Sequence, residues 1–153
     1  MIVAWRIDKR RHTAQAFTGD GARVHGGRWN HKGTPVVYLA DSLALATLEK
    51  FVHLGRAVPR IQWVAFRVRI PPLIVRSLDR RRLPMRWREE PPGEATKDLG
   101  TAWVEDRSSA VLKVPSVLIP IEFNLVVNPL HPDFRRLQID APEAFVFDAR
   151  MWK

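Results

Sequence analysis

Short runs of apolar residues, often alternating with polar ones, cover most of this chain and predict strands more often than helices. The apolar segment 2–7 predicts a first strand. A buried strand is expected over 35–40, where Pro35 is followed by two valines. Residues 62–70 alternate apolar and polar side chains before a pair of prolines, which indicates a strand with one face in water.

One stretch, residues 43–55, has the apolar spacing of a helix. Asp41 or Ser42 can cap its first turn, and Gly55 and Pro59 end it. Residues 19–33 contain five glycines and almost no apolar periodicity, so a loop is expected there. Residues 76–100 are basic, proline-rich and irregular, which predicts a long loop within the domain.

The last third of the chain predicts three more strands, over 115–120, 123–127 and 137–139. Many short strands around one helix indicate an α+β fold. A chain of 153 residues is long enough for one domain with its own core, so a single domain is expected over 1–153. No apolar run approaches the roughly 20 residues that a membrane span needs. A cytoplasmic protein with no membrane contact is therefore expected.

The composition limits the chemistry and suggests a class of ligand. The chain has no cysteine, which excludes a disulfide scaffold, a thiolate metal site and a cysteine nucleophile. The five histidines form no metal-binding motif, so no metal site is expected. The formal net charge is +9, and 19 of the 25 cations are arginine. Such a balance suits phosphates, nucleic acid or an acidic protein surface, although it can also serve solubility alone.

Glu49 is the most informative single position. It shares the predicted helix with mostly apolar neighbours, and a carboxylate is costly to bury unless it is paired or hydrogen-bonded. The alternative is that this part of the helix reaches the surface and Glu49 points to water.

Three further features lie in positions that often carry function. Residues 26–30 join two glycines to Arg28, which could hold an anion close to the backbone. Tyr38, the only tyrosine, lies just before a strand-to-helix junction. Ser116 is a small hydroxyl in an apolar run. Each has a structural alternative: an ordinary turn, a core aromatic residue with a bonded hydroxyl, and a cross-strand hydrogen bond, respectively.

Together these residues resemble a known family. Segments 21–23, 26–30, 33–40 and 48–49, with 112–116 and a closing segment over 122–134, are similar to the RES-domain toxins of bacterial RES–Xre toxin–antitoxin modules. The family is named after Arg, Glu and Ser, which correspond to Arg28, Glu49 and Ser116. The resemblance covers nearly the whole chain and is least distinctive over 71–100.

The resemblance implies an ADP-ribosyltransferase-like domain with a mixed, split β-sheet around an NAD cleft. It implies that NAD+ is a substrate, broken down by hydrolysis or by phosphorolysis with inorganic phosphate as co-substrate, and that no cofactor is permanently bound. It also implies an Xre-family antitoxin that occludes the active site, a homodimer within the toxin–antitoxin complex, and contact with DNA only through the antitoxin.

We assign roles to the candidate residues as hypotheses consistent with that chemistry. Nicotinamide is already a good leaving group, so a carboxylate such as Glu49 is needed mainly beneath the ribose, where positive charge develops. Arg28 would bind pyrophosphate or an attacking phosphate, and Ser116 would contact the carboxamide or position Glu49. The expected helpers for NAD+ binding are Tyr38, Arg6 and Asn124.

Three other functions remain open at this point. The same pocket could transfer ADP-ribose to a protein. The basic runs Lys9–Arg11 and Arg80–Arg82 could bind nucleic acid or support a ribonuclease, but no nucleic-acid motif accompanies them and such runs are usually solvated. The domain could also bind a partner without catalysis.

Overall fold

The computed structural model describes residues 1–153 and contains a single mixed sheet with three α-helices. The strands are β1 (Ile2–Lys9), β2 (Val37–Ala40), β3 (Trp63–Ile70), β4 (Val75–Ser77), β5 (Val111–Pro115), β6 (Phe123–Val127), β7 (Gln138–Ile139) and β8 (Glu143–Phe145). The helices are α1 (Asp20–His25), α2 (Leu43–Phe51) and α3 (Glu94–Asp106), and five short 3-10 turns connect the elements. The predicted α+β class is confirmed.

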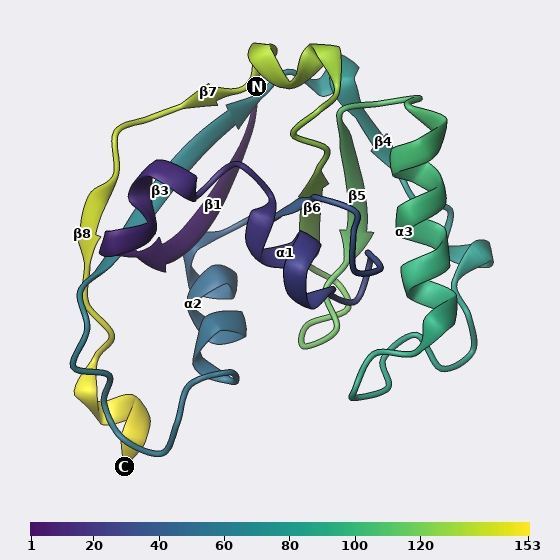
Figure 1. The fold of residues 1–153 in the computed structure, drawn as a ribbon. Coiled ribbons are helices and arrows are strands. Elements are labelled where there is room, and N and C mark those ends of the chain that lie inside the picture. Colours follow the sequence, from purple (N-terminus) through teal and green to yellow (C-terminus); the bar gives the residue numbers. More distant parts are fainter.

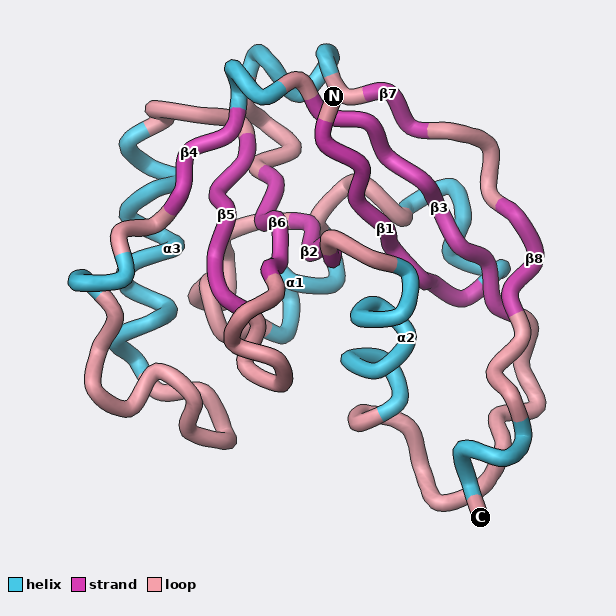
Figure 2. The backbone as a smooth tube through the Cα atoms, turned by 180° about the vertical axis from the view of Figure 1, so that it is seen from behind, coloured by secondary structure: helices cyan, strands magenta, loops and turns pink.

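The sheet is nearly divided in two at its centre. Its strand order is β4-β5-β6-β2-β1-β3-β7, with β8 also paired to β3, and only the β4–β5 pair is parallel. β1 pairs with β3 along its whole length, whereas β1 and β2 share one residue pair, Trp5 with Ala40. The expected mixed, split sheet is therefore present, and its two halves separate next to β2 (Figures 1 and 2).

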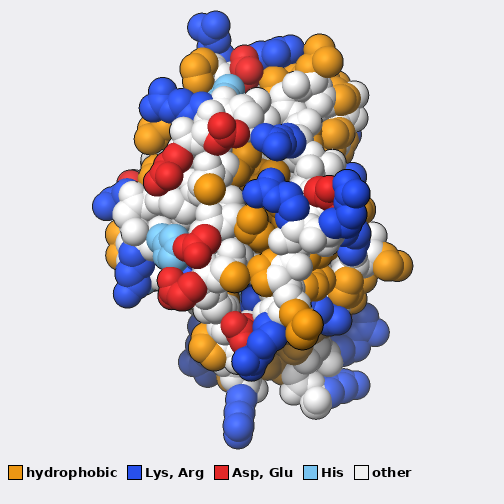
Figure 3. Space-filling view, turned by 90° about the vertical axis from the view of Figure 1, so that its right-hand side faces the viewer, with side chains coloured by type: hydrophobic (Ala, Val, Ile, Leu, Met, Phe, Trp, Pro, Cys, Tyr) orange, Lys and Arg blue, Asp and Glu red, His pale blue; other side chains and the backbone are white.

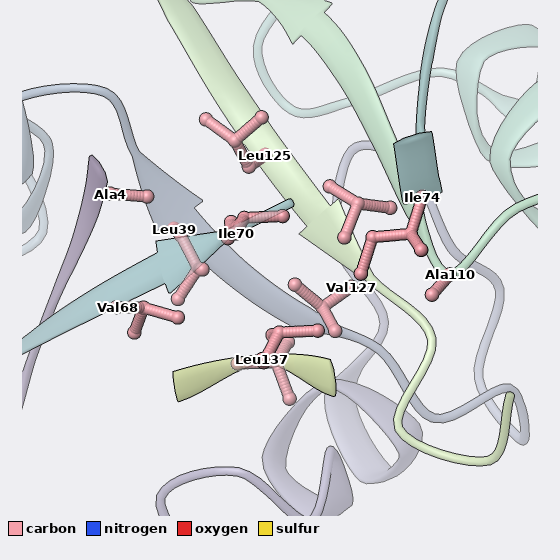
Figure 4. Close-up of a cluster of buried hydrophobic side chains, with 11 residues drawn as sticks. Ala4, Leu39, Val68, Ile70, Ile74, Ala110, Leu125, Val127 and Leu137 are labelled. Carbon is pink, nitrogen blue, oxygen red and sulfur yellow. The ribbon is translucent and has the colours of Figure 1, made fainter. Parts of the chain in front are cut away.

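Side-chain packing joins the two halves where the backbone pairing is lost. The largest buried cluster takes Ala4 from β1, Val68 and Ile70 from β3, and Leu39 and Leu125 from β2 and β6 (Figure 4). These side chains lie on one face of the sheet. Burial of such aliphatic side chains is worth about 1.5–3 kcal/mol each, so this shared core keeps the halves together.

The opposite face is covered in two places. α2 packs Leu45 and Ala46 against the β1–β3 half, and α3 packs Trp103 against the β5–β6 half. Because neighbouring residues of a strand point to opposite faces, Tyr38 and Asn124 lie on this face between the two helices. Their strand partners there are Val126 and Ala40.

Several expectations from the sequence are corrected by the structure. The predicted strand over 115–120 is displaced: the strand is Val111–Pro115, and a turn follows because Ser116 accepts hydrogen bonds from the next backbone amides. The helix predicted over 43–55 ends at Phe51, beyond which the chain is mostly exposed. β4 and β8 were not expected. The strands over 2–7, 62–70, 123–127 and 137–139 are confirmed within one or two residues.

Two helices lie where loops were predicted. α1 occupies part of 19–33 and buries no residue, so it has no apolar periodicity to signal it. α3 begins inside 76–100 and buries only Thr96, Gly100 and Trp103. Its buried face is made of small and polar residues around one tryptophan, which gives no apolar stripe in the sequence.

Gly100 explains how α3 packs against residues 26–36, the glycine-rich loop between α1 and β2. A Cβ at this position would overlap the carbonyl oxygen of Trp29, which is itself buried. The backbones of α3 and the loop therefore touch at a point that only glycine permits.

We expect Gly100→Ala to lower the free energy of unfolding by about 1–3 kcal/mol, because the added methyl group must push α3 away from Trp29. Gly21→Ala in α1 is the matched control, since a Cβ there meets nothing within 4 Å. The control should change stability by less than about 1 kcal/mol. Urea denaturation measures both, and equal values for the two variants would contradict the proposed close approach.

Candidate active site

The carboxylate of Glu49 is held by two hydrogen bonds from different strands. Glu49 lies near the end of α2, whose first turn is capped by Ser42. Its Oε1 accepts a bond from Ser116 Oγ (2.8 Å), and its Oε2 accepts one from Asn124 Nδ2 (2.7 Å). The predicted buried carboxylate is thus paired rather than solvated, and both oxygens are fixed.

Burial raises the pKa of the Glu49 carboxyl above its usual range. The hydrogen bonds from Ser116 and Asn124 act in the opposite direction, because they stabilise the charged form. Asp41 raises the pKa further and His53 lowers it. A carboxyl with an upward-shifted pKa that is still held by donors is typical of a catalytic group.

Ser116 is completely buried in the turn that follows β5. Its hydroxyl donates to Glu49 and accepts from the amides of Leu118 (3.2 Å) and Ile119 (3.4 Å). Its own amide donates to the carbonyl of Glu122 (2.9 Å). The turn therefore orients the hydroxyl toward the carboxylate. The alternative, a cross-strand hydrogen bond between neighbouring strands, is not what the Ser116 hydroxyl makes.

Arg28 is held by a different part of the chain from the Glu49 cluster. Its guanidinium does not bond to Glu49. Nη1 donates to the carbonyls of Trp87 (2.9 Å) and Glu89 (2.8 Å), and Nη2 donates to Glu90 Oε2 (2.9 Å). The side chain is 11% exposed, and burial lowers the pKa of its guanidinium. Arg28 therefore joins the glycine-rich loop to segment 87–90, which the sequence predicted only as irregular chain.

Tyr38 organises the same loop through its hydroxyl. The hydroxyl donates to Asn30 Oδ1 (2.6 Å) and accepts from the amide of Trp29 (3.1 Å). Asn30 is fully buried, and its side-chain amide donates to one carbonyl of α1 and to two carbonyls of the loop. A Cβ at Gly27 would lie 2.7 Å from the Tyr38 hydroxyl oxygen, so glycine is needed there. Burial raises the pKa of Tyr38, which stays neutral.

Arg6 and Asn124 bond to consecutive carbonyls of β2 at the split in the sheet. Arg6 Nη1 donates to the carbonyl of Tyr38 (3.2 Å), and Nη2 donates to Asp8 (3.1 Å). Asn124 Nδ2 also donates to the carbonyl of Leu39 (3.2 Å). Burial lowers the pKa of Arg6. The Arg6 side chain thus supplies a donor to β2 where β1 no longer pairs with it.

The structure divides the six predicted site residues into two connected groups. Glu49, Ser116 and Asn124 form one hydrogen-bonded cluster. Tyr38 and Arg28 both act on the glycine-rich loop, and Arg6 contacts only the backbone of Tyr38 within this set. The groups meet at β2, which carries Tyr38 and accepts the bond from Asn124.

Sequence reasoning missed residues that connect these groups. Asn30 was noted only as part of a glycine-rich segment. Arg80 and Arg88 were not singled out as site residues, yet they donate to the carbonyls of Pro120 (2.7 Å) and Val117 (2.9 Å) in the turn after Ser116. No pattern in the sequence distinguishes them from solvated arginines, because the partners are backbone atoms about 30 to 40 residues away.

Two cavities, of about 350 and 500 Å³, lie away from these residues. The smaller one is lined by residues 9–11 and 61–62, and the larger one mainly by residues 58–59 and 61–62, the start of β3 and residues 142 and 144–147. Neither includes Arg28 or Glu49. The expected NAD cleft therefore stays a prediction.

Three ionisable side chains outside the predicted set gather at the start of α3. His31 Nε2 lies 2.6 Å from Asp98, and His31 Nδ1 lies 3.6 Å from Glu94. Their ligand atoms all fall within 4.8 Å, as a metal site would require. The acidic residues are exposed, and Figure 3 shows acidic side chains around a histidine on this face. The direct contacts of His31 with Asp98 and Glu94 account for the arrangement, which attaches the glycine-rich loop to α3.

Comparison with known proteins decides the family. A sequence model of the RES domain matches residues 3–148. The chain belongs to the RES domain family. It is 40% identical over 151 residues to "Toxin Res" of Yersinia enterocolitica, covering 98% of this chain and 99% of that protein. It is 36% identical over 152 residues to "Prs ADP-ribosylating toxin" of a Sphingobium species, covering 96% and 94%. The expected resemblance to RES-domain toxins is confirmed.

The fold also matches a solved structure of low sequence identity. A chain of the MbcT–MbcA toxin–antitoxin complex of M. tuberculosis aligns with a TM-score of 0.76 and 18% identity, over 98% of this chain and 86% of that one. The match confirms the ADP-ribosyltransferase-like fold of a RES domain. None of the helices has the length and apolar character needed to cross a membrane.

We expect Tyr38→Phe to lower the free energy of unfolding by about 1–3 kcal/mol, because the Trp29 backbone amide and the Asn30 side-chain oxygen Oδ1 lose their buried partner. The ring itself still packs beside Val126. Chemical denaturation measures the loss, and a change within about 0.5 kcal/mol would show that the hydroxyl does not hold the loop.

Glu49 should also make stability depend on pH. Because its pKa is raised in the folded protein, its contribution is fully present below the unfolded pKa and is lost as pH rises through the folded pKa. The free energy of unfolding of Glu49→Gln minus that of the unsubstituted protein should therefore increase from pH 4 to pH 8, because only the unsubstituted protein loses stability as pH rises. A tenfold difference in the acid dissociation constant between the folded and unfolded states changes the free energy of unfolding by about 1.4 kcal/mol.

The control is Glu105→Gln, an exposed carboxyl in α3. As a surface substitution it should change the free energy of unfolding by less than about 0.5 kcal/mol. A difference for Glu49→Gln that does not change with pH would contradict the assigned burial of the Glu49 carboxylate.

Proposed function

We propose that this RES domain is the toxin of a toxin–antitoxin pair and that it breaks the bond between nicotinamide and ribose in NAD+. The observation that carries the proposal is the partly buried carboxylate of Glu49, which Ser116 and Asn124 hold by hydrogen bonds. The family membership and the toxin names of the relatives support the same conclusion.

The chemistry needs a fixed negative charge and an acceptor. When the ribose C1–nicotinamide N bond breaks, its electron pair neutralises the pyridinium nitrogen, so the leaving group needs no proton. The ribose becomes oxocarbenium-like, and the carboxylate of Glu49 stabilises that charge with little screening by solvent. The oxygen of water or inorganic phosphate then bonds to C1. When water attacks, its released proton can pass to Glu49, whose raised pKa suits a general base.

The other residues have supporting roles in this proposal. Arg28 has given three hydrogens to segment 87–90, which leaves the Nε hydrogen and one Nη2 hydrogen for a phosphate oxygen of the substrate. Tyr38 holds the loop that carries Arg28 and provides an aromatic wall. Ser116 orients Glu49, and Asn124 keeps its second oxygen fixed. Arg6 is a secondary site for the pyrophosphate.

The partners follow from the same proposal. An Xre-family antitoxin would cover the site, and the complex would contain a homodimer of this chain that contacts DNA only through the antitoxin. The solved neighbour is a toxin–antitoxin complex, which supports an antitoxin partner. The net charge of +9 suits an acidic surface on the antitoxin and would speed association. NAD+ as substrate fits a cytoplasmic site of action.

Transfer of ADP-ribose to a protein is the second candidate. It is favoured by one relative, at 36% identity, that is named an ADP-ribosylating toxin. The same carboxylate would serve, with a protein side chain as acceptor in place of water or phosphate. The nucleic-acid alternative is weaker, since Arg80 is committed to the turn after Ser116 and Arg81 to Asp79.

Purified protein incubated with NAD+ should release nicotinamide, and Glu49→Gln should reduce that rate by about 10²–10⁴-fold because it removes the charge beneath the ribose. Arg82→Ala, which removes an exposed cation whose side chain makes no hydrogen bond or ion pair, should retain full activity. Chromatography of the second product separates free ADP-ribose, ADP-ribose phosphate and labelled protein.

Expression in cells gives the matching biological test. The unsubstituted protein should deplete NAD+ and arrest growth, while Glu49→Gln should do neither. NAD+ that stays constant during growth arrest would contradict the proposal, and equal arrest by both proteins would shift attention to the basic surface.

A further inference from the structure

Arg28 binds the backbone on both sides of Arg88. The two carbonyls that accept bonds from its Nη1 belong to Trp87 and Glu89, the residues on either side of Arg88. The Arg28–Glu90 ion pair fixes the next residue as well. Three bonds from one largely buried guanidinium therefore hold the backbone from which Arg88 extends.

Arg88 in turn contacts the turn that carries Ser116. Its Nε donates to the carbonyl of Val117 at 2.9 Å, one residue after Ser116. Arg80 donates to the carbonyl of Pro120 at 2.7 Å, near the other end of the turn, and lies over the Phe123 ring at 5.8 Å. Neither carbonyl accepts a backbone N–H. The two arginines thus supply hydrogen bonds that the backbone of the turn does not make.

This turn depends on such outside contacts more than the strands do. Its internal backbone bonds are Ser116 to Glu122 and Glu122 to Ile119. Ile121 is 85% exposed, so the turn has little apolar burial at its tip. A segment with few buried contacts opens locally at low cost. Fixing Val117 therefore restricts the neighbouring Ser116 hydroxyl.

We propose that Arg88 is a positioning residue, which holds the Ser116 turn so that the hydroxyl stays on Glu49, and that Arg28 keeps Arg88 in place. Arg28 and Glu49 are then coupled without touching, through Arg88, Val117 and Ser116. The kinetic consequences rest on the proposed NAD+ cleavage, whereas the structural coupling does not.

The surrounding cations have other partners, which makes the assignment specific. Arg81 pairs with Asp79 and Arg86 with Glu89 at the surface. Arg82 is exposed, and its side chain makes no hydrogen bond or ion pair within 4.0 Å. Within the basic segment 80–88, only Arg80 and Arg88 reach across to the Ser116 turn.

The coupling has a consequence for the titration of Glu49. The groups that face this carboxyl are Ser116 and Asn124, which lower its pKa, Asp41 before α2, which raises it, and His53 after α2, which lowers it. If the turn loosens, the Ser116 hydrogen bond is weakened and the other three are unchanged. With the burial of the carboxyl unchanged, which is the largest cause of its raised pKa, weakening the Ser116 hydrogen bond raises the pKa of Glu49 further, in the same direction as in Ser116→Ala.

The test combines an NMR titration with steady-state kinetics. Protein with ¹³C-labelled glutamate is titrated, and the Glu49 carboxyl signal is assigned by its absence in Glu49→Gln. Arg88→Ala and Ser116→Ala should both move the Glu49 midpoint to higher pH. In the Ser116→Ala background, Arg88→Ala should add no further movement. Arg82→Ala is the matched control and should leave the midpoint unchanged.

In the kinetic arm, Arg88→Ala should lower kcat on the order of fivefold, as expected for loss of one charge-assisted hydrogen bond. The KM for NAD+ should change less than twofold. The acidic limb of the kcat–pH profile should move to higher pH. Arg88→Lys should recover part of the loss, because an ammonium can still donate to Val117. Thermal melting followed by circular dichroism checks that each variant folds, and Arg88→Lys supplies the comparison if Arg88→Ala does not.

The outcomes separate the two proposals. An unchanged Glu49 midpoint in Arg88→Ala, or an effect that adds to that of Ser116→Ala, would overturn the positioning role. A raised KM with full kcat would also overturn it, since Arg88 would then bind substrate directly. If the unsubstituted protein does not cleave NAD+, the proposed function fails, and the NMR titration alone still decides the role of Arg88.

Discussion

Everything at this site depends on one constraint: a carboxylate that has been taken out of water must keep a donor on each oxygen. Glu49 comes from α2, its donors Ser116 and Asn124 come from the β5–β6 half of the sheet, and α2 packs on the other half. The hydrogen bonds therefore span the split in the sheet. Burial of the Glu49 carboxylate has a cost and a benefit with the same origin. The low polarity that raises the pKa of Glu49 also strengthens its electric field at a developing cation.

The split itself lets side chains meet at β2. Full pairing of β1 with β2 would occupy the carbonyls of β2 with backbone amides. With a single residue pair there, the Tyr38 carbonyl accepts a bond from the Arg6 side chain instead. The loops around the site are then fixed largely by arginine bonds to backbone carbonyls, from Arg28, Arg80 and Arg88. Part of the large arginine content thus serves internal structure, and the net charge alone would not have shown this.

The sequence predicted the strands with strong apolar patterns and the α2 helix well, because the spacing of their apolar residues indicates which face is buried. It failed for α3, whose buried face consists of Thr96, Gly100 and Trp103, and for the strand before Ser116, whose end is set by side-chain bonds to its own turn. Glu49, Ser116 and Asn124 were found, and they lie together. The partners of Arg28 were not, since backbone carbonyls carry no residue signature.

A crystal structure of Glu49→Gln with intact NAD+ would show whether this carboxyl position contacts the substrate. We expect the amide of residue 49 to lie within hydrogen-bond distance of the nicotinamide ribose, with Ser116 and Asn124 still at its other side. We also expect a phosphate oxygen at the free edge of Arg28. NAD+ bound at a distance from residue 49, for instance in the cavity beside β8, would contradict the proposed role of Glu49.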